Sequence, residues 1–457
     1  MTDIPEGPTG GDAAREGSLD APFRRPIAWQ DEAYYDMAAV EAEMERVFDI
    51  CHGCRRCFNL CDSFPRLFDM VDESPTGEID GVAKADYAKV DEACTLCDMC
   101  FLTKCPYVPP HPFDLDFPHL ILRYRAAKRR AGHKEFVRDQ LAETDRNGKL
   151  AKPVAGLANW ATARENTPLR KMLDAVAGID AEVELPKYHS KTATDRLRTP
   201  IAPNADGPAL GRKVALYATC FVDYNKPDTA VAAAKVLALQ GVEAKLVYPE
   251  CCGMPELESG EIDKVAGRAR RIAKAFMPLI DDGYDVVALT ASCGLMMKFE
   301  WPLILPDDPE VKRLAAATRD ISEYVVELSR SVGLAPGLRP IEGGVTVHHA
   351  CHARAQNMGP KSAEMLRLIP DTKVELVERC SGHGGTFGVM KDTAPIARKV
   401  GKAAARQVKQ KGQDTLCSDC PLACKHIGQL LTVELAAGTN PPVQAHPIEV
   451  LARAYAL

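Results

Sequence analysis

The sequence predicts a mostly helical α+β module at the start of the chain, followed by an α/β unit with a parallel sheet that occurs twice. Two observations lead to this fold class. Eight of the 17 cysteines lie between residues 51 and 105, whereas none lies between 106 and 219. Beyond residue 210, short apolar segments typical of buried strands alternate with helical segments, which is the pattern of parallel α/β units.

The composition excludes several classes of protein. The chain has 457 residues, of which 46% are hydrophobic, so it can form about three domains. Because the net charge is -6, we expect no broad basic face and no binding to nucleic acid. No run of about 20 apolar residues is present, so no transmembrane segment is predicted. Residues 1–30 are rich in Gly, Pro and acidic residues and lack a signal-peptide pattern, which predicts a disordered tail on a cytoplasmic protein.

Two runs of closely spaced cysteines follow this tail. The first is "CHGCRRCFNLC" and the second is "CTLCDMCFLTKCP". Their thiols are, in order, Cys51, Cys54, Cys57, Cys61, Cys94, Cys97, Cys100 and Cys105. In a reducing compartment such a set binds metal or reacts more often than it forms disulfides. Three thiolates at this spacing can bind three irons of one four-iron cube.

Both runs resemble those of bacterial ferredoxins, C-x2-C-x2-C-x3-C-P, in which the fourth cysteine binds the other cluster. We therefore predict two [4Fe–4S] clusters with crossed ligands. One takes Cys51, Cys54, Cys57 and Cys105, and the other takes Cys94, Cys97, Cys100 and Cys61. Asp62 replaces the first proline, and the second run is one residue longer, which affects the local turn more than the number of ligands. Zinc is the alternative, but a third cysteine at the same spacing, twice, fits it poorly.

The segments around these runs are predicted to be helical or inserted. Residues 33–50, "AYYDMAAVEAEMERVFDI", have the apolar spacing of a helix that packs on the first cluster. Residues 62–93 look like an insertion between the two runs. Residues 119–143 predict an amphipathic helix with a basic face, which could lie on anionic lipid, bind an acidic partner, or simply face solvent. Residues 154–179 predict two helices separated near Pro168.

A stretch rich in Pro, Gly, Thr and Lys ends near residue 210 and indicates a linker. The expected organisation therefore has five segments. They are a tail at 1–30, a ferredoxin-type module at 31–118, a helical connector and linker at 119–210, and two repeats at 211–335 and 336–457.

The two repeats carry cysteines after matching apolar segments. "KVALYATC" resembles "VTVHHAC", "EAKLVYPECCG" resembles "KVELVERCSG", and "DVVALTASCGLM" resembles "DTLCSDC". The matched cysteines lie 131, 129 and 124 residues apart, and the pairs are Cys220 and Cys351, Cys251 and Cys380, and Cys293 and Cys417. Ligands of parallel sheets bind beyond the carboxyl ends of the strands. We therefore expect all three positions of each repeat to lie there and to form sites.

The patterns "C…CCG…C-x-x-M" and "C…CSG…C-x-x-C" resemble the paired cysteine-rich CCG domains of heterodisulfide reductase. The whole order, with two ferredoxin runs first, resembles the family of the iron–sulfur subunit of anaerobic glycerol-3-phosphate dehydrogenase. The iron–sulfur subunits of glycolate oxidase have a similar plan. The resemblance covers roughly residues 45 to 435.

In heterodisulfide reductase, a complete motif implies a non-cubane cluster held by five cysteines. Each repeat here offers four, since Met296 and Ser381 replace the fifth. The candidate metal ligands are Cys220, Cys251, Cys252 and Cys293 in the first repeat, and Cys351, Cys380, Cys417 and Cys420 in the second. They could hold one or two further clusters, one in each repeat or one shared. Nearby imidazoles could ligate or donate hydrogen bonds, namely His348, His349, His352 and His383, whereas Cys424 has no counterpart.

The sequence shows no G-x-G-x-x-G after a strand, no Walker loop and no nucleophile triad, which predicts no flavin or nicotinamide site in this chain. The family resemblance implies an iron–sulfur electron-transfer subunit of a flavoprotein dehydrogenase complex. Electrons would pass from the flavoprotein partner toward quinone, with contact at the inner face of the cell membrane. The alternatives are a catalytic subunit that reduces a disulfide, an electron donor to a soluble peroxide-reducing partner, and a metal scaffold without redox function.

Overall fold

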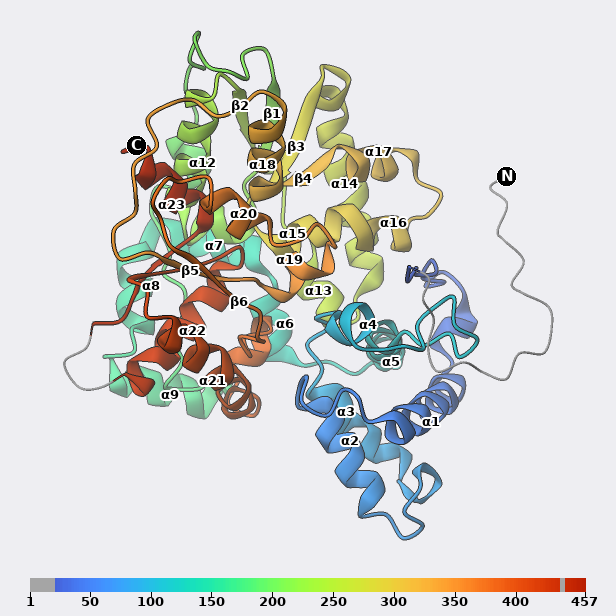
Figure 1. Ribbon diagram of the computed structural model, residues 1–457. Coiled ribbons are helices and arrows are strands. Elements are labelled where there is room, and N and C mark those ends of the chain that lie inside the picture. Colours follow the sequence, from blue (N-terminus) through green and yellow to red (C-terminus); the bar gives the residue numbers. More distant parts are fainter. Residues whose placement is uncertain (1–20, 436–439) are drawn as a thin grey trace. The chain divides into compact units, whose positions relative to one another are not determined.

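The computed structural model describes residues 21–435 and 440–457 (Figure 1). The chain divides into two compact units, the first ending at Ala131 and the second beginning at Gly132. Residues 1–20 of the predicted tail lie outside the described residues. In residues 21–30, the Arg24 guanidinium binds Asp98 at 2.5 Å and Asp116 at 2.9 Å, so this part of the predicted tail is held by the first unit.

The first unit consists of helices. They are η1 (Glu32–Tyr35), α1 (Met37–Cys54), α2 (Ser63–Asp72), η2 (Ile79–Gly81), η3 (Lys84–Tyr87), α3 (Ala88–Glu92), α4 (Met99–Thr103) and α5 (Phe117–Arg130). Residues 21–131 contain no strand, so the prediction of a mixed α+β module is wrong in its β part. Helix α1 confirms the helix expected at 33–50, and its Asp36 cap accepts a hydrogen bond from the amide of Ala38 at 2.9 Å.

The core of this unit is apolar and aromatic. Val40, Met44 and Phe48 on α1 are fully buried. The ring of Phe64 on α2 lies 4.8 Å from that of Phe117 on α5. This packing of α1, α2 and α5 places the ends of helices, where the cysteines lie, on a rigid support.

The expected basic helix at 119–143 is two shorter helices, because Gly132 has a left-handed φ of 93° and ends the first of them. The basic side chains of α5 bind groups within the unit. Arg123 donates to the carbonyl of Tyr34 at 2.8 Å, Arg125 donates to Asp91 at 2.6 Å, and Arg130 donates to Glu32 at 2.6 Å. The basic face of α5 therefore holds the unit together.

The second unit begins with the connector helices. They are α6 (Phe136–Ala142), α7 (Thr144–Ala151), η4 (Lys152–Val154), α8 (Ala155–Thr162), α9 (Thr167–Ala177) and α10 (Ala193–Arg196). Helices α8 and α9 confirm the predicted pair, with Pro168 in the first turn of α9, where its missing amide hydrogen costs nothing.

Two four-stranded parallel sheets follow, one in each repeat. The first has the order β2-β1-β3-β4 and the second the order β6-β5-β7-β8. Their strands are β1 (Lys213–Tyr217), β2 (Glu243–Val247), β3 (Tyr284–Ala288), β4 (Thr318–Asp320), β5 (Val345–His348), β6 (Val374–Val377), β7 (Thr415–Ser418) and β8 (Val443–Ala445). The identical order confirms the repeat. In both sheets the winding direction reverses beside the first strand, which creates a crevice at the carboxyl ends of the strands.

Helices surround both sheets, with α12 packed on β2 and α14 on β3 (Figure 1). The helices of the first repeat are α11 (Cys220–Tyr224), α12 (Pro227–Leu239), α13 (Met254–Glu258), α14 (Ile262–Asp281), α15 (Ala291–Leu295), the π-helix η5 (Met296–Glu300), α16 (Trp301–Ile304), α17 (Pro309–Ala317) and α18 (Ile321–Ser331). Those of the second are α19 (Cys351–Ala355), α20 (Lys361–Leu366), η6 (Gly385–Gly388), α21 (Ala394–Lys411), α22 (Pro421–Glu434) and α23 (Pro447–Ala454).

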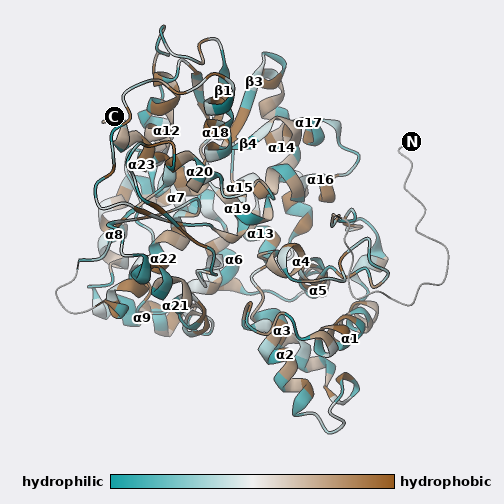
Figure 2. Cartoon of the chain, viewed as in Figure 1, coloured by the Kyte–Doolittle hydropathy of each residue, from teal (hydrophilic) through white to brown (hydrophobic). Residues whose placement is uncertain are grey.

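One apolar core joins the two repeats. Leu216 and Val236 of the first repeat belong to the same buried cluster as Val347 and Leu451 of the second. Helix α12 packs against α23, and α18 packs against α20. Figure 2 shows teal and brown residues alternating along the helices, as expected for amphipathic helices that cover this core. The repeats are therefore halves of one folded unit.

Replacing His446 by asparagine is expected to weaken the loss of stability in mild acid. His446 caps α23, its Nδ1 accepts from the amide of Ile448 at 3.3 Å, and burial lowers its pKa to about 3. In the unfolded chain the imidazole of His446 takes up a proton below its usual pKa of about 6.5, whereas in the folded chain it stays neutral. The free energy of unfolding that is present above pH 6.5 therefore decreases as the pH falls. This histidine accounts for roughly 2 kcal/mol of loss between pH 6.5 and pH 5.

Urea unfolding of the parent and of His446→Asn at pH 7 and pH 5 measures this difference. Asparagine can still cap the helix, so the variant isolates the titration. His133→Asn, at an exposed position, is the matched control and is expected to keep the pH dependence of the parent. Equal pH slopes for His446→Asn and the parent would contradict the expectation.

Candidate metal centres

The eight cysteines of the first unit lie at helix ends and in loops. Cys51 and Cys54 form the last turn of α1, which Arg55 ends with a left-handed φ of 52°. Cys57 and Cys61 occupy the turn before α2. Such a backbone reversal lets thiols from both sides of the helix end approach one another.

In the second run a loop, and not a helix end, reverses the backbone and brings the thiols together. Leu96 and Asp98 have left-handed φ angles of 46° and 64°, so the chain curls between Cys94 and Cys100. Arg125 fixes the entrance of this loop by donating to the carbonyl of Cys94 at 2.6 Å. Cys100 lies in α4 and Cys105 follows it.

The thiols of the two runs influence one another across the runs. Burial raises the pKa of Cys51 well above its usual value, and the charges that raise it further are Cys105, Cys57 and Cys54. Burial likewise raises the pKa of Cys100, and the charges that add to this effect are Cys97, Cys94, Cys61 and Cys57. Cys105 from the second run is therefore a neighbour of the first run, and Cys61 is a neighbour of the second. Crossed ligation needs this grouping.

These donor sets fit iron–sulfur clusters. A buried thiolate among other thiolates is unfavourable unless a cation neutralises it. Within the described parts of the chain, no three His, Cys, Asp or Glu side chains converge as they would around a single metal ion. Ligation of iron by the eight cysteines stays a prediction.

The first repeat brings its four thiols into a row. The Sγ atoms of Cys220 and Cys251 lie 3.7 Å apart. Hydrogen bonding with Cys220 and Cys252 lowers the pKa of Cys251 well below its usual value. Hydrogen bonds with Cys251 and Cys293 raise the pKa of Cys252. The adjacent cysteines of "CCG" therefore connect the thiol beyond β1 with the thiol beyond β3, as the crevice predicts.

An aspartate from the connector holds this loop. The carboxylate of Asp145, in α7, accepts the amide hydrogen of Cys251 at 2.7 Å and a hydrogen bond from the hydroxyl of Tyr248. The Arg268 guanidinium lies 3.3 Å from the same carboxylate. Because Asp145 is more than 100 residues away in the chain and belongs to no motif, sequence reasoning missed it.

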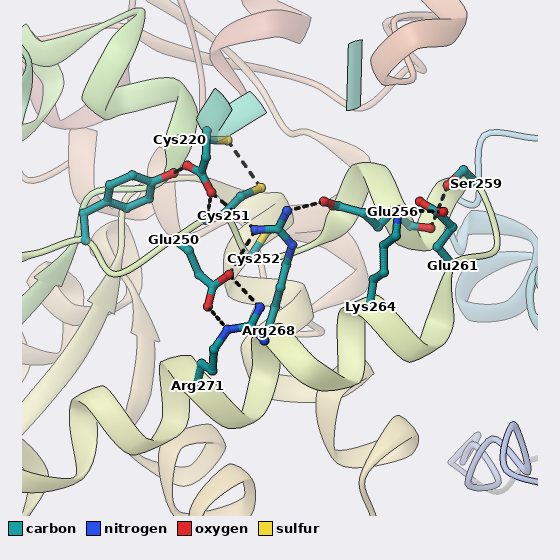
Figure 3. Close-up of polar contacts among 12 residues, drawn as sticks. Cys220, Glu250, Cys251, Cys252, Glu256, Ser259, Glu261, Lys264, Arg268 and Arg271 are labelled. Atoms are coloured by element: carbon teal, nitrogen blue, oxygen red, sulfur yellow. Dashed lines mark hydrogen bonds and ion pairs between the residues drawn. The ribbon is translucent and has the colours of Figure 1, made fainter. Parts of the chain in front are cut away.

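Arg268 is the centre of a buried ion cluster, drawn in Figure 3 between Glu250 and Glu256. Its Nη1 lies 3.1 Å from Glu250, and its Nη2 lies 2.5 Å from Glu256. Glu256 is 1% exposed; burial, and then the charge of Cys251, raise its pKa to about 7. Arg271 binds the other side of Glu250 at 2.7 Å. The guanidinium of Arg268 thus places one positive charge beside the thiol row.

The second repeat differs at its third cysteine. Cys351 begins α19, Cys380 follows β6, and Cys420 caps α22, all beyond strand ends. Cys417 lies inside β7, in the apolar core, so its expected position beyond a strand end is wrong. Cys424, which the sequence left unmatched, is buried in α22 and donates weakly to the carbonyl of Leu416 at 3.5 Å.

Strand register explains the difference. Tyr217 pairs with Ala288 in the first sheet, and His348 pairs with Ser418 in the second. The structural offset at the third strand is therefore 130 residues, and Cys417 corresponds to Val287 instead of Cys293. Matching the cysteines alone shifted the alignment, because the two loops differ in where their cysteine lies.

The two repeats meet at these loops. The Ser292 hydroxyl lies 2.9 Å from Nδ1 of His352, and the amide of Ala291 donates to the carbonyl of Asp419 at 3.3 Å. Burial raises the pKa of Cys420 to about 11, and the charge of Cys293 in the other repeat adds to this effect. Cys293 of the first repeat and Cys420 of the second thus lie near the contact between the repeats, as a shared site requires.

The four candidate imidazoles have different surroundings. His348 has partners on both ring nitrogens, the Ser418 hydroxyl at 3.0 Å and the Arg379 carbonyl at 2.9 Å, so it supports the fold. His349 is held through Nδ1 by Glu378 at 3.2 Å, while its buried Nε2 lacks a hydrogen-bond partner. The buried Nε2 of His383 also lacks one. These two side chains could supply ligands that the second repeat lacks.

The two repeats match a known family of domains, and the chain is similar to several known proteins. The cysteine-rich domain family CCG matches residues 214–298 and 345–426, which span the first three strands of each sheet and the loops that follow them. Lactate utilization protein A of Geobacillus kaustophilus is 32% identical over 222 residues, 46% of this chain and 87% of that protein. The B subunit of the fumarate reductase (CoM/CoB) of Methanothermobacter marburgensis is 28% identical over 234 residues, 50% of this chain and 44% of that protein.

A glutamate racemase of Bacillus anthracis aligns with 10% identity and a TM-score of 0.26, covering 54% of this chain and 80% of that chain, which is too low to bear on the fold. Each helix in the described residues is too short or too polar to cross a membrane.

The C subunit of the anaerobic glycerol-3-phosphate dehydrogenase of Escherichia coli K12 is 30% identical over 352 residues, 76% of this chain and 83% of that protein. The chain belongs to the family of this dehydrogenase subunit.

Proposed function

We propose that this chain is the iron–sulfur electron-transfer subunit of a flavoprotein dehydrogenase complex and passes electrons from the flavin toward quinone. The observation that supports the proposal is the mutual influence of the thiols of both runs around Cys51 and Cys100 in the first unit. When bound, [4Fe–4S] clusters supply one-electron transfer at potentials set by burial and hydrogen bonds. The family, whose named members include dehydrogenase and reductase subunits, supports a flavoprotein partner.

The residues of this chain bind, shield and orient. In the first unit, helix ends and the Arg125 contact would hold the thiols in place, while the core excludes water. In the first repeat, Asp145 and Arg268 would hold the Cys251 loop against the other thiols. We also propose that the first unit, the connector that follows it and the two repeats act as the functional divisions of the chain, with quinone met at the inner face of the membrane.

Reduction of a disulfide at the repeats receives less support. A non-cubane site needs five thiolates, and the first repeat offers four. In the second, the core position of Cys417 leaves Cys351, Cys380 and Cys420 beyond the strand ends. Electron transfer needs no complete set of this kind, since one cluster in each repeat, or one shared, would extend a relay.

Low-temperature EPR of the anaerobically prepared, dithionite-reduced chain tests the proposal. We expect the signals of two [4Fe–4S] clusters that interact, because clusters that each take ligands from both runs lie close together. Addition of a quinone analogue is expected to oxidise the clusters again. Colourless protein with zinc as its metal would contradict the proposal, as would clusters that a reduced flavoprotein dehydrogenase of this family cannot reduce.

A further inference from the structure

The connector helices expose an unusual amount of apolar surface. Among the described residues, 17 large apolar side chains are exposed, and six of them fall between residues 150 and 176. They are Leu150 (66% exposed), Val154 (48%), Leu157 (63%), Trp160 (61%), Met172 (54%) and Val176 (82%). Scattered exposed apolar residues are ordinary, but such a concentration marks a surface that binds something.

Helical spacing places these side chains on one face. Leu150, Val154, Leu157 and Trp160 follow one another at intervals of four, three and three residues through α7, η4 and α8. Met172 and Val176 lie four residues apart on α9, which contacts α8. We call these six residues the connector face. The α7–α8 segment and helix α9, which contact each other, therefore each carry an uncovered apolar side.

The charges beside the connector face are mostly positive. Its exposed cations are Arg146, Lys149, Arg164 and Lys171. The carboxylates of the same stretch are few: Asp145 belongs to the Arg268 cluster, Asp174 binds Lys391, and Glu165 remains exposed. An apolar face with an aromatic residue and a cationic rim suits the surface of an anionic bilayer, where the ring enters the interface and the cations meet headgroups.

The connector face also begins beside the thiol row. Asp145 and Leu150 lie on the same helix, five residues and about 7.5 Å apart along its axis. Asp145 holds the amide of Cys251. The connector face thus begins on the helix that holds the Cys251 loop. The basic helix α5, by contrast, has bound its cations to groups within its own unit.

We propose that the connector face docks this chain on the surface of an anionic lipid bilayer, with the side chain of Trp160 in the headgroup region. This deepens the proposed function by naming the surface through which the chain would meet the membrane, and it rests on that function only for the identity of the electron acceptor. The lipid itself, and no particular protein, is the occupant.

Co-sedimentation of the full iron-loaded chain with vesicles tests the docking. The vesicles contain phosphatidylcholine and phosphatidylglycerol at 3:1, and a second set contains phosphatidylcholine alone. We expect binding to the anionic vesicles that weakens with salt, and a blue shift of Trp160 emission. Leu157→Glu combined with Trp160→Glu is expected to lower the partition coefficient by at least about tenfold. Val433→Glu, at a side chain 77% exposed on α22, is the matched control and is expected to bind as the parent does.

Trp160→Phe guards against a folding defect, since it keeps an apolar ring and is expected to keep binding while losing the blue shift. No binding of the parent to anionic vesicles, or equal binding by the double Glu variant, would overturn the proposal. The proposal would also be overturned if the parent bound no vesicles and the double Glu variant lost a dimer or a complex with a flavoprotein. The connector face would then bind protein and not lipid. EPR separates the two proposals: absent clusters would end the proposed function, whereas intact clusters without vesicle binding would end only the docking.

Discussion

Cys61→Ala is expected to remove the cluster associated with the second cysteine run, although Cys61 lies in the first. Its thiol is among the charges that surround Cys100, together with Cys94 and Cys97. A cube that loses one of four thiolates exposes an iron and is readily lost. We therefore expect about four iron atoms fewer in each chain and the disappearance of one of two EPR signals.

The reciprocal variant and a spare thiol give the controls. Cys54→Ala is expected to remove the other signal, because Cys54 lies among the charges around Cys51. Cys424→Ala changes a buried thiol packed in the core of the second repeat and is expected to leave both signals of the first unit in place. If Cys61→Ala and Cys54→Ala removed the same signal, each run would hold its own cluster and the crossed arrangement would be wrong.

Arg268→Ala is expected to destabilise the second unit strongly and to loosen the "CCG" loop. The guanidinium lies within 3.3 Å of carboxylates on Asp145, Glu250 and Glu256, and its side chain is 13% exposed. Removing Arg268 leaves the partly buried carboxylates of Asp145 and Glu250 without their shared cation, while Glu256, whose pKa is already about 7, takes up a proton. The expected loss is about 3 kcal/mol, the lower end of the range for buried pairs. Asp145 would then repel its neighbours while still holding the Cys251 amide. Urea unfolding of the anaerobic protein measures the loss.

Arg271→Ala is the matched control, because Arg271 binds the same Glu250 but is 62% exposed. A surface pair of this kind contributes about 0–1 kcal/mol, so a small change is expected. Arg268→Lys keeps the charge but cannot bridge three carboxylates, and an intermediate loss is expected. Equal stabilities of Arg268→Ala and Arg271→Ala would show that the buried cluster does not support the loop.

The first three strands of each repeat were predictable, and the fourth strand of each, at one edge of its sheet, was not. Each of β1, β2, β3, β5, β6 and β7 is a short apolar run that ends near a cysteine. The fourth strands, β4 and β8, have three residues each, which is too short for any periodic pattern. They form because a neighbouring strand already offers free backbone groups.

The cysteine alignment shows where sequence reasoning went astray. Spacing alone matched Cys293 with Cys417. Strand register instead makes Cys417 equivalent to Val287 of the first repeat. A buried thiol behaves as a small apolar residue, so a core cysteine and a ligand look alike in a sequence. The burial of Cys417 in β7 separates them.

The sequence by itself determined the kind of chemistry and the repeated fold, because cysteine spacing and apolar periodicity act over a few residues along the backbone. Only the tertiary structure decided which distant groups meet. Asp145 reaches Cys251, Cys293 approaches Cys420, the cations of α5 bind within their own unit, and the connector face stays uncovered. Such contacts depend on how helices pack over the sheets, and that packing is a property of the whole core instead of any local pattern.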